Sequence, residues 1–198
     1  MSVAKPLPHD AAKLHVTGAA RYVDDIPTPR GTLHLAFGLS PVAEGELTAL
    51  DLEAVRSAPG VVKVLSADDL VHDCDTSPSN HDEPLLATGE IHFAGQPLYL
   101  VVATSHLAAR RAAQLGKPQI TPRDPILTVE QALAADSRFE DGPRIYQKGD
   151  AEAALSKASR RLSGQIEMGG QEHFYLEGQA AMALPQDNGD ILVHSSTQ

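Results

Sequence analysis

The sequence predicts a mixed fold of the α/β or α+β class, in which helices pack on a sheet. Strand-like and helix-like stretches alternate from about residue 33 to residue 121, as expected for such a layered arrangement. Apolar residues make up 42% of the 198 positions, so the chain can form a sizeable core. Aromatic residues make up 4% and tryptophan is absent, so that core must consist mainly of Leu, Val, Ile and Ala.

The first elements of this alternation begin at residue 33. Large apolar side chains occupy every second position of residues 33–39, which predicts a strand. A further strand, a short helix that stops at a Pro-Gly pair, a buried strand at Val61–Leu65 and a second short helix are expected to follow. Ser66 is a suitable N-cap for that second helix.

A polar segment separates these elements from the next group. Residues 71–84, "VHDCDTSPSNHDEP", lack apolar periodicity and are expected to form a long surface loop of the kind that usually lies over a site or a partner. A strand, a Gly-Gln-Pro turn, an apolar strand at Leu98–Ala103 and a helix capped by Ser105 should follow. The last strand of this group is expected around Gln119–Thr121.

The amino-terminal residues contain many turn formers. Val16–Pro29 is expected to be extended chain with a turn at Asp24 and Asp25. These two carboxylates could also form an acid/base pair. Adjacent side chains on an extended chain point to opposite sides, however, which favours a turn-capping role.

The composition changes near residue 122. Prolines at 118, 122 and 125 precede a Thr128-x-x-Gln131 capping box that predicts a helix, and a second capped helix is expected at Asp150–Ala158. Strands are expected at residues 162–168, 178–184 and 190–196, the last two joined by the hairpin turn "PQDNGD". A terminal antiparallel pair exposes an apolar edge unless something covers it, so we expect the chain to be part of a longer polypeptide.

Charge and cysteine content exclude several classes of function. Twenty-six acidic and sixteen basic residues give a net charge of −10, which disfavours nucleic acid and membrane surfaces as partners. Cys74 is the only cysteine, which excludes an intrachain disulfide and any cysteine-based zinc or iron–sulfur site built by this chain alone. The sequence shows neither a secretory signal nor an apolar run of about 18 residues, so a cytoplasmic location is expected.

Common catalytic motifs are absent. The sequence lacks a phosphate-binding loop, a dinucleotide-binding glycine motif, a nucleophile elbow and an H-E-x-x-H zinc motif. His72–Asp75, "HDCD", contains residue types that bind metals, but no second cluster completes a coordination shell, which favours a solvated loop. Arg110 and Arg111 could bind an anion, and a solvated helix face is favoured there too.

The densest group of polar side chains lies at Gly169–Gln179, "GGQEHFYLEGQ". If the chain there is extended, one face carries only polar groups: Gln171, His173, Tyr175 and Glu177. A core strand tolerates such a face only if every group is hydrogen-bonded. The pattern therefore fits a turn, a catalytic site or a buried network, and the spacing alone names no ligand.

Four stretches, in order, resemble a known family. They are "VTGAARYVDD", "LDLEAVRSAPGVVKVLSADDL", "GEIHFAGQPLYLVVATSHLAARRAA" and "GGQEHFYLEGQAAMALP". Together they resemble the start of the molybdenum-binding subunit of the molybdenum hydroxylases, the family of xanthine dehydrogenases and aldehyde oxidases. The run "GGQEHFYLE" with "ILTVEQALAADSRFEDGP" favours the xanthine dehydrogenase branch, in its two-subunit bacterial form.

The resemblance implies a domain organisation. Residues 1–11 would be an extended segment, residues 12–122 an α/β-hammerhead domain, and residues 123–198 the beginning of a molybdopterin-binding domain with antiparallel strands. The stretch "QLGKPQITPRDP" departs from the family pattern, in which an uninterrupted helix is followed by a strand and a tyrosine-rich exit. The departure falls at the expected end of the first domain.

The resemblance also implies a reaction, cofactors and partners. A molybdenum centre on molybdopterin would hydroxylate a purine, converting hypoxanthine and xanthine to urate. Electrons would pass through [2Fe–2S] clusters and FAD to NAD, with the clusters and the flavin on a partner subunit of a hetero-oligomer. By itself the present chain would be inactive.

The site residues that the resemblance implies are few. Gln171 matches the family glutamine that hydrogen-bonds the molybdenum oxo ligand, so it is the expected catalytic and cofactor-binding residue. Glu172, His173 and Glu177 are expected to support it, and no residue of this chain is expected to coordinate the metal directly. The family's glycine-rich cofactor loop and its substrate-binding Glu and Arg would lie beyond Gln198.

Two alternatives remain open from the sequence. The chain could belong to a molybdenum hydroxylase that acts on aldehydes or another N-heterocycle. It could also be a non-catalytic α/β module that binds a partner.

Overall fold

The structure is a computed structural model in which residues 3–197 are described, except 73, 79, 139–141 and 143–144. The chain forms two compact units. We call Arg30–Lys148 the central unit, and we call Met1–Pro29 together with Gly149–Gln198 the terminal unit. Each unit is described separately below.

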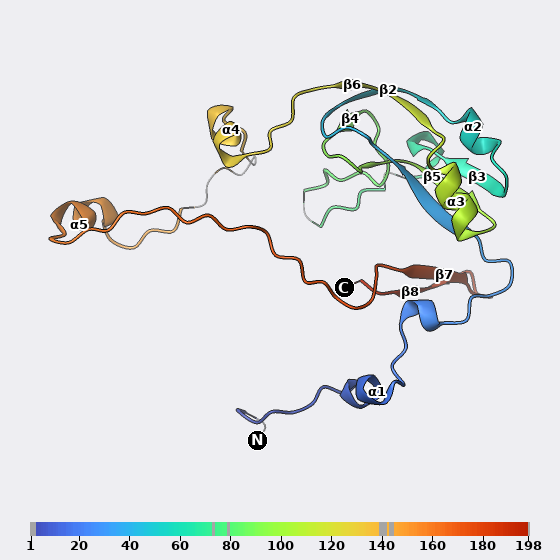
Figure 1. The fold of residues 1–198 in the computed structure, drawn as a ribbon, viewed down its shortest axis with the longest axis horizontal. Helices are drawn as coiled ribbons and strands as arrows, with labels where there is room; N and C mark the ends of the chain where they lie inside the picture. Colours follow the sequence, from blue (N-terminus) through green and yellow to red (C-terminus); the bar gives the residue numbers. More distant parts are fainter. Residues whose placement is uncertain (1–2, 73, 79, 139–141, 143–144, 198) are drawn as a thin grey trace. The chain divides into compact units, whose positions relative to one another are not determined.

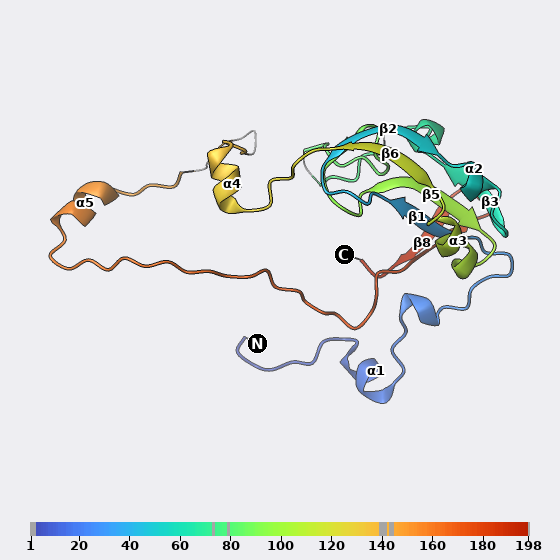
Figure 2. The ribbon, with the colours of Figure 1, turned by 45° about the horizontal axis from the view of Figure 1, so that its top comes forward.

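The central unit contains two three-stranded antiparallel sheets. The first has the order β1-β5-β3 and consists of β1 (His34–Leu39), β5 (Pro97–Ala103) and β3 (Val61–Leu65). The second has the order β4-β2-β6 and consists of β4 (Glu90–Ile91), β2 (Gly45–Asp51) and β6 (Lys117–Pro122). Strands β2 and β6 run side by side in both views of the ribbon (Figure 1, Figure 2). The predicted mixed fold is confirmed, and its sheets are antiparallel.

The helices of the central unit are short. They are α2 (Glu53–Arg56), the 3-10 helix η2 (Ala67–Asp69), α3 (His106–Ala112) and α4 (Val129–Ala134). Helix α3 lies against the sheet of β1, β5 and β3 (Figure 1).

The predicted helix caps of this unit are confirmed. The Ser105 hydroxyl accepts a hydrogen bond from the backbone N–H of Ala108 at 3.2 Å. Thr128 and Gln131 form the expected capping box, because the Thr128 hydroxyl accepts from the Gln131 N–H and the Gln131 side chain accepts from the Thr128 N–H. At Ser66 the backbone N–H donates to the Asp69 carboxylate at 2.8 Å, which lowers the pKa of that carboxyl.

One apolar cluster holds the central unit together. Its buried members come from both sheets, from α2 with its N-cap, from α3 and from the chain before β4: Leu52, Val55, Val64, Ala87, Ile91, Leu98, Tyr99, Val101 and Ala112. Tyr99 is the only aromatic residue among them, in keeping with the low aromatic content. Its hydroxyl donates to the carbonyl of Ala113 at 2.8 Å and accepts from the N–H of Gly116 at 3.2 Å. Burial raises the pKa of the Tyr99 hydroxyl.

Strand β1 forms where the alternation predicted it, but its large side chains do not enter the core. Leu35, Phe37 and Leu39 are 58%, 42% and 53% exposed, while Gly38 is buried and pairs directly with Tyr99. A Cβ on Gly38 would lie 1.9 Å from the Tyr99 ring. The glycine is therefore required at this position because the aromatic ring fills the space of its missing side chain.

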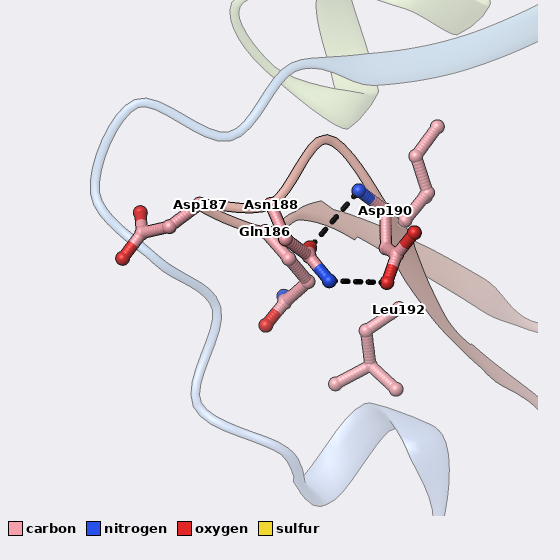
Figure 3. Close-up of a pocket in the computed structure, with 6 residues that line it drawn as sticks. Gln186, Asp187, Asn188, Asp190 and Leu192 are labelled. Carbon is pink, nitrogen blue, oxygen red and sulfur yellow. Dashed lines mark hydrogen bonds between the residues drawn. The ribbon is translucent and has the colours of Figure 1, made fainter.

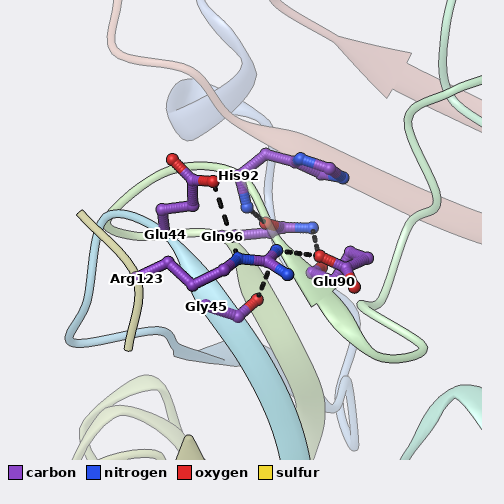
Figure 4. A network of polar contacts seen from close by, with 6 residues as sticks. All are labelled: Glu44, Gly45, Glu90, His92, Gln96 and Arg123. Atoms are coloured by element: carbon purple, nitrogen blue, oxygen red, sulfur yellow. Dashed lines mark hydrogen bonds and ion pairs between the residues drawn. The ribbon is translucent and has the colours of Figure 1, made fainter. Parts of the chain in front are cut away.

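A polar network joins β2, β4 and the end of β6 (Figure 4). The Arg123 guanidinium pairs with the carboxylates of Glu90 and Glu44 and donates to the carbonyl of Gly45 at 3.4 Å. The hydrogen bond from Arg123 lowers the pKa of Glu90. Buried Gln96 accepts from the His92 N–H at 2.7 Å and donates to the Glu90 carbonyl at 3.4 Å. The network fixes the chain at Arg123, directly after β6.

The polar segment after η2 forms the predicted loop. Residues 71–84 contain no helix or strand among those described, and an isolated bridge between Asp75 and Pro84 closes the segment. Thr76 strengthens this closure, because its N–H and its hydroxyl both donate to the Glu83 carbonyl.

The terminal unit begins with α1 (Ala12–Thr17) and the 3-10 helix η1 (Val23–Asp25). The prediction of extended chain is therefore wrong for Val16 and Thr17, which belong to α1, whereas the predicted turn at Asp24 and Asp25 forms as η1. Helix α1 continues through Thr17 and ends at Gly18, whose φ of 71° is readily adopted by glycine. At η1 the Asp25 carboxylate accepts from the Tyr22 N–H at 2.9 Å, so the expected turn-capping role is confirmed for Asp25.

The remaining elements of the terminal unit are α5 (Ala151–Lys157), β7 (Ala181–Pro185) and β8 (Ile191–Ser195). The Asp150 carboxylate caps α5 by accepting from the Ala153 N–H at 2.9 Å, as predicted. Strands β7 and β8 form the predicted antiparallel hairpin. In its turn, Asn188 accepts from the Asp190 N–H at 3.1 Å and its side-chain amide donates to the Asp190 carboxylate (Figure 3).

The strand expected at residues 162–168 is not present. These residues form irregular chain, with Leu162, Ile166 and Met168 104%, 82% and 85% exposed. A strand requires a neighbouring strand for its backbone hydrogen bonds, and no described residue pairs with this stretch. The alternation of side chains alone was not sufficient for a strand to form.

Candidate functional site

The polar segment Gly169–Gln179 lies in the terminal unit, between the irregular stretch after α5 and the hairpin. It forms neither a strand nor a helix. Phe174 has a φ of 51°, in the left-handed region, which interrupts the alternation of side chains. The expectation of one regular polar strand face is therefore wrong, because the backbone turns in the middle of the segment.

The structure leaves Gln171 open to solvent. The residue is exposed, and no described residue forms a hydrogen bond with its side chain. Two glycines precede it, and no atom lies within 4 Å of the position that a Cβ would take on Gly169 or Gly170. The Gln171 side chain therefore has a hydrogen-bond donor and an acceptor available for a ligand, and the backbone of the two preceding glycines is open to close approach.

The two residues after Gln171 are also exposed. The Glu172 carboxylate accepts a hydrogen bond from the Phe174 N–H at 3.3 Å, which closes a local turn. His173 is exposed and has no described partner. The structure thus assigns Glu172 a local backbone contact, and among the described residues no hydrogen bond joins Gln171 to Glu172 or His173.

Glu177 is the best-connected of the predicted site residues. Its Oε1 accepts a hydrogen bond from the backbone N–H of Val23, with 2.6 Å between the two atoms. Both residues are half-buried and they lie 154 positions apart in the sequence. The segment is thereby tied to η1 in the amino-terminal part of the same unit. Sequence reasoning missed this contact, because no spacing rule relates a carboxylate to one particular backbone amide so far away.

The carboxyl end of the segment is held by the hairpin. The Ser196 hydroxyl donates to the carbonyl of Gly178 at 3.0 Å and accepts from the N–H of Ala180 at 2.9 Å. A side-chain contact within the segment adds to this, because the Gln179 amide donates to the Tyr175 hydroxyl at 2.8 Å. The segment is therefore tied to other parts of its unit from Glu177 onwards, while Gln171 remains accessible.

The structure does not support a metal site at His72–Asp75 or an anion site at Arg110 and Arg111 in the part of the chain that it describes. Among the described residues, no three His, Cys, Asp or Glu side chains come close enough together to hold a metal ion. His72, Cys74 and Asp75 lie in the loop before Pro84, and the fourth member of that group, Asp73, lies outside the described residues. Arg110 and Arg111 are both exposed on α3, in agreement with a solvated helix face.

Gln171 lines neither of two depressions in the surface. One follows the hairpin turn and is lined by Gln186–Asn188 and Asp190–Leu192 (Figure 3). A second lies in the central unit between β1 and α3, where Leu35, Phe37 and Arg110 contribute to its walls. Within the described parts of the chain, no helix combines the length and the apolar character that a membrane span needs.

Two family models match the chain. Residues 17–119 match the model described as aldehyde oxidase and xanthine dehydrogenase, a/b hammerhead domain. Residues 138–198 match the molybdopterin cofactor-binding domain. The first match covers the strands of the central unit as far as the middle of β6, and the second covers the segment with Gln171 and the hairpin.

Individual proteins show the same similarity. Xanthine dehydrogenase of Drosophila subobscura is 39% identical over 198 residues, and aldehyde oxidase 1 of Rattus norvegicus is 37% identical over 198 residues; each alignment covers 99% of this chain. The chain spans only 15% and 14% of the length of these two relatives.

A solved structure supports the fold. The aldehyde oxidoreductase of Desulfovibrio gigas superimposes with a TM-score of 0.81 at 26% identity, covering 96% of this chain and 23% of that one. The similarity therefore extends over both units of the present chain.

Proposed function

Because the chain belongs to the family of aldehyde oxidases and xanthine dehydrogenases, we propose that it is the amino-terminal part of the molybdenum-binding subunit of a xanthine dehydrogenase. The complete enzyme hydroxylates hypoxanthine and xanthine to urate. Its electrons pass through [2Fe–2S] clusters and FAD, carried on a partner subunit in a hetero-oligomer, to NAD. The proposal places the enzyme in the cytoplasm.

The observation that carries this proposal is the 39% identity to a xanthine dehydrogenase along the whole chain. A second candidate is an aldehyde-oxidising enzyme of the same family. It is favoured by the 37% identity to a rat aldehyde oxidase and by the fold similarity to a bacterial aldehyde oxidoreductase.

The residues of the segment fit a contact with a molybdopterin cofactor. Gln171 offers an exposed carboxamide without a described partner, and Gly169 and Gly170 leave the backbone before it open to close approach. No described group of side chains could hold the metal itself. When bound, the cofactor supplies the redox chemistry of the hydroxylation, and in this proposal Gln171 donates a hydrogen bond to it.

The remaining expectations belong to the same proposal. Residues 12–122 form the α/β-hammerhead domain, and residues 123–198 begin the molybdopterin-binding domain. Glu172, His173 and Glu177 support Gln171 without touching the cofactor. The substrate-binding residues are contributed by other parts of the complete protein.

The test is a comparison of substrates with the complete enzyme. We expect the purified full-length protein, loaded with its cofactors, to reduce NAD with xanthine at a kcat/KM at least about tenfold above that with benzaldehyde, a difference of about 1.4 kcal/mol in transition-state binding. A preference for benzaldehyde would contradict the proposal and support the aldehyde-oxidising candidate. A folded full-length protein that holds no molybdenum and oxidises neither substrate would support the non-catalytic module.

A further inference from the structure

The contact between Glu177 and Val23 gives the site segment an attachment outside its own sequence neighbourhood. The Glu177 carboxylate and the Val23 N–H are 2.6 Å apart, and both residues are partly shielded from solvent. A hydrogen bond from a backbone amide to a carboxylate is charge-assisted and is about twice as strong as one between neutral groups.

The start of η1 provides a donor that needs such an acceptor. Val23 is the first residue of the 3-10 turn, so its N–H has no carbonyl partner within the turn. The preceding N–H, that of Tyr22, is already bound by the Asp25 carboxylate at 2.9 Å. The Val23 N–H therefore needs an acceptor from outside the turn, and the Glu177 carboxylate accepts its hydrogen bond.

The segment that carries Gln171 depends on contacts of this kind. It forms no strand, so no ladder of backbone hydrogen bonds fixes it. Ser196 holds Gly178 and Ala180 on the hairpin, and Glu177 holds the next position toward Gln171 on η1. Loss of the Glu177 contact would release the chain on the side of Gln171 while leaving the hairpin intact.

We propose that Glu177 is a positioning residue, which binds the Val23 N–H and thereby holds the segment so that Gln171 meets the cofactor. This inference rests on the proposed role of Gln171. It makes η1, which lies near the amino terminus, a structural component of the molybdenum site.

The position of Val23 permits a test that removes only the donor. Proline lacks an N–H and suits the first position of a helical turn, and the extended backbone of Tyr22 (φ −101°, ψ 171°) suits the position before proline. Val23→Pro therefore deletes the hydrogen bond while keeping the turn. Val23→Ala is the matched control, because it shortens the side chain and keeps the N–H.

The kinetic test uses the full-length, cofactor-loaded enzyme and both xanthine and benzaldehyde. We expect Glu177→Ala and Val23→Pro each to lower kcat about tenfold, with KM and molybdenum content changed less than about twofold. Glu177→Gln, which keeps an acceptor oxygen, and Val23→Ala should retain most of the activity. The double variant Glu177→Ala/Val23→Pro should be no slower than either single variant, because both remove the same contact.

Additive losses in the double variant, or a Glu177→Ala enzyme with the kcat of the wild type, would overturn the inference. The substrate preference of the wild type tests the proposed function independently of the role of Glu177. If the wild type oxidises benzaldehyde and not xanthine, the order of the variants on benzaldehyde still tests the role of Glu177.

A second readout does not depend on turnover. In hydrogen-exchange mass spectrometry of the same enzymes, peptides covering residues 169–179 should exchange faster in Glu177→Ala and in Val23→Pro than in the wild type. Val23→Ala should leave their exchange unchanged. Equal exchange in all four proteins would show that the contact does not hold the segment, whatever the activities are.

Discussion

The two units of the chain differ in how deeply they bury isoleucine and glutamine side chains. Ile91, in the central unit, is completely buried in a cluster built from both sheets, whereas Ile166, in the terminal unit, is 82% exposed. Gln96 is buried and uses both ends of its amide within the central unit. Gln171 is exposed and binds no described residue.

This difference indicates that the two units have different roles in the protein. The central unit buries an apolar cluster and pairs the amide of its buried Gln96 internally, although the large side chains of β1 remain exposed. The terminal unit presents apolar side chains and an unused amide to its surroundings, which is the condition of a surface that contacts something else. The central unit contains the buried apolar cluster, and the terminal unit contains the residue proposed to contact the cofactor.

The sharpest test of this contrast replaces the two isoleucines. Ile91→Ala should lower the free energy of unfolding by about 2–5 kcal/mol, because it leaves a cavity in the core cluster of the central unit. Ile166→Ala should change it by less than about 0.5 kcal/mol, because the side chain is already in water. Urea titrations of both variants, followed by far-UV circular dichroism, give the comparison. Equal losses in the two variants would mean that Ile166 is packed in solution.

Two glycines provide a second matched pair. Gly38→Ala should cost about 1–3 kcal/mol, because the new methyl group would lie 1.9 Å from the Tyr99 ring and displace it from its contacts with Ala113 and Gly116. Gly170→Ala should cost less than about 0.5 kcal/mol, because nothing lies within 4 Å of the added atom. Thermal unfolding of each variant measures both values. A Gly38→Ala protein as stable as the wild type would show that the ring can move without loss.

The smallest effect is expected at the exposed ion pair of Glu90 and Arg123. The pKa of Glu90 is lowered in the folded chain by the hydrogen bond from Arg123, so its contribution to stability is present above the unfolded pKa of about 4.3. That contribution is lost as the pH falls through the lower, folded pKa. The stability difference between wild type and Glu90→Gln should therefore be small at pH 7 and vanish in acid. Urea titrations at pH 7 and pH 3 measure it, and a difference that grew in acid would contradict the pKa direction.

Much of the central unit could be predicted from the sequence. The strands at residues 61–65 and 97–103, and the caps at Ser105 and Thr128, follow from local patterns that tertiary contacts reinforce. The burial of β1 could not be predicted in the same way. Its large residues lie on the exposed face, and its buried position is Gly38, whose missing side chain leaves room for the Tyr99 ring.

Less of the terminal unit could be predicted. The alternation at residues 162–168 suggested a strand, but a strand also needs a partner, and the sequence of the stretch does not reveal whether one is present. The polar segment was recognised as unusual, yet the turn at Phe174 and the contact from Val23 to Glu177 depend on backbone conformation and on residues 154 positions apart. The role of Gln171 remains a prediction from the family resemblance.

The most direct test of the account is the turnover of a Gln171→Ala variant of the full-length, cofactor-loaded enzyme. A hydrogen bond to a charged group contributes about 1.5–3 kcal/mol, so we expect kcat with the preferred substrate to fall by at least about tenfold while molybdenum, iron and flavin contents stay unchanged. Gln165→Ala, which changes the same exposed residue type in the neighbouring irregular stretch, should keep the kcat of the wild type. If the Gln171→Ala enzyme turns over as fast as the Gln165→Ala control, Gln171 does not contact the cofactor and the central claim is contradicted.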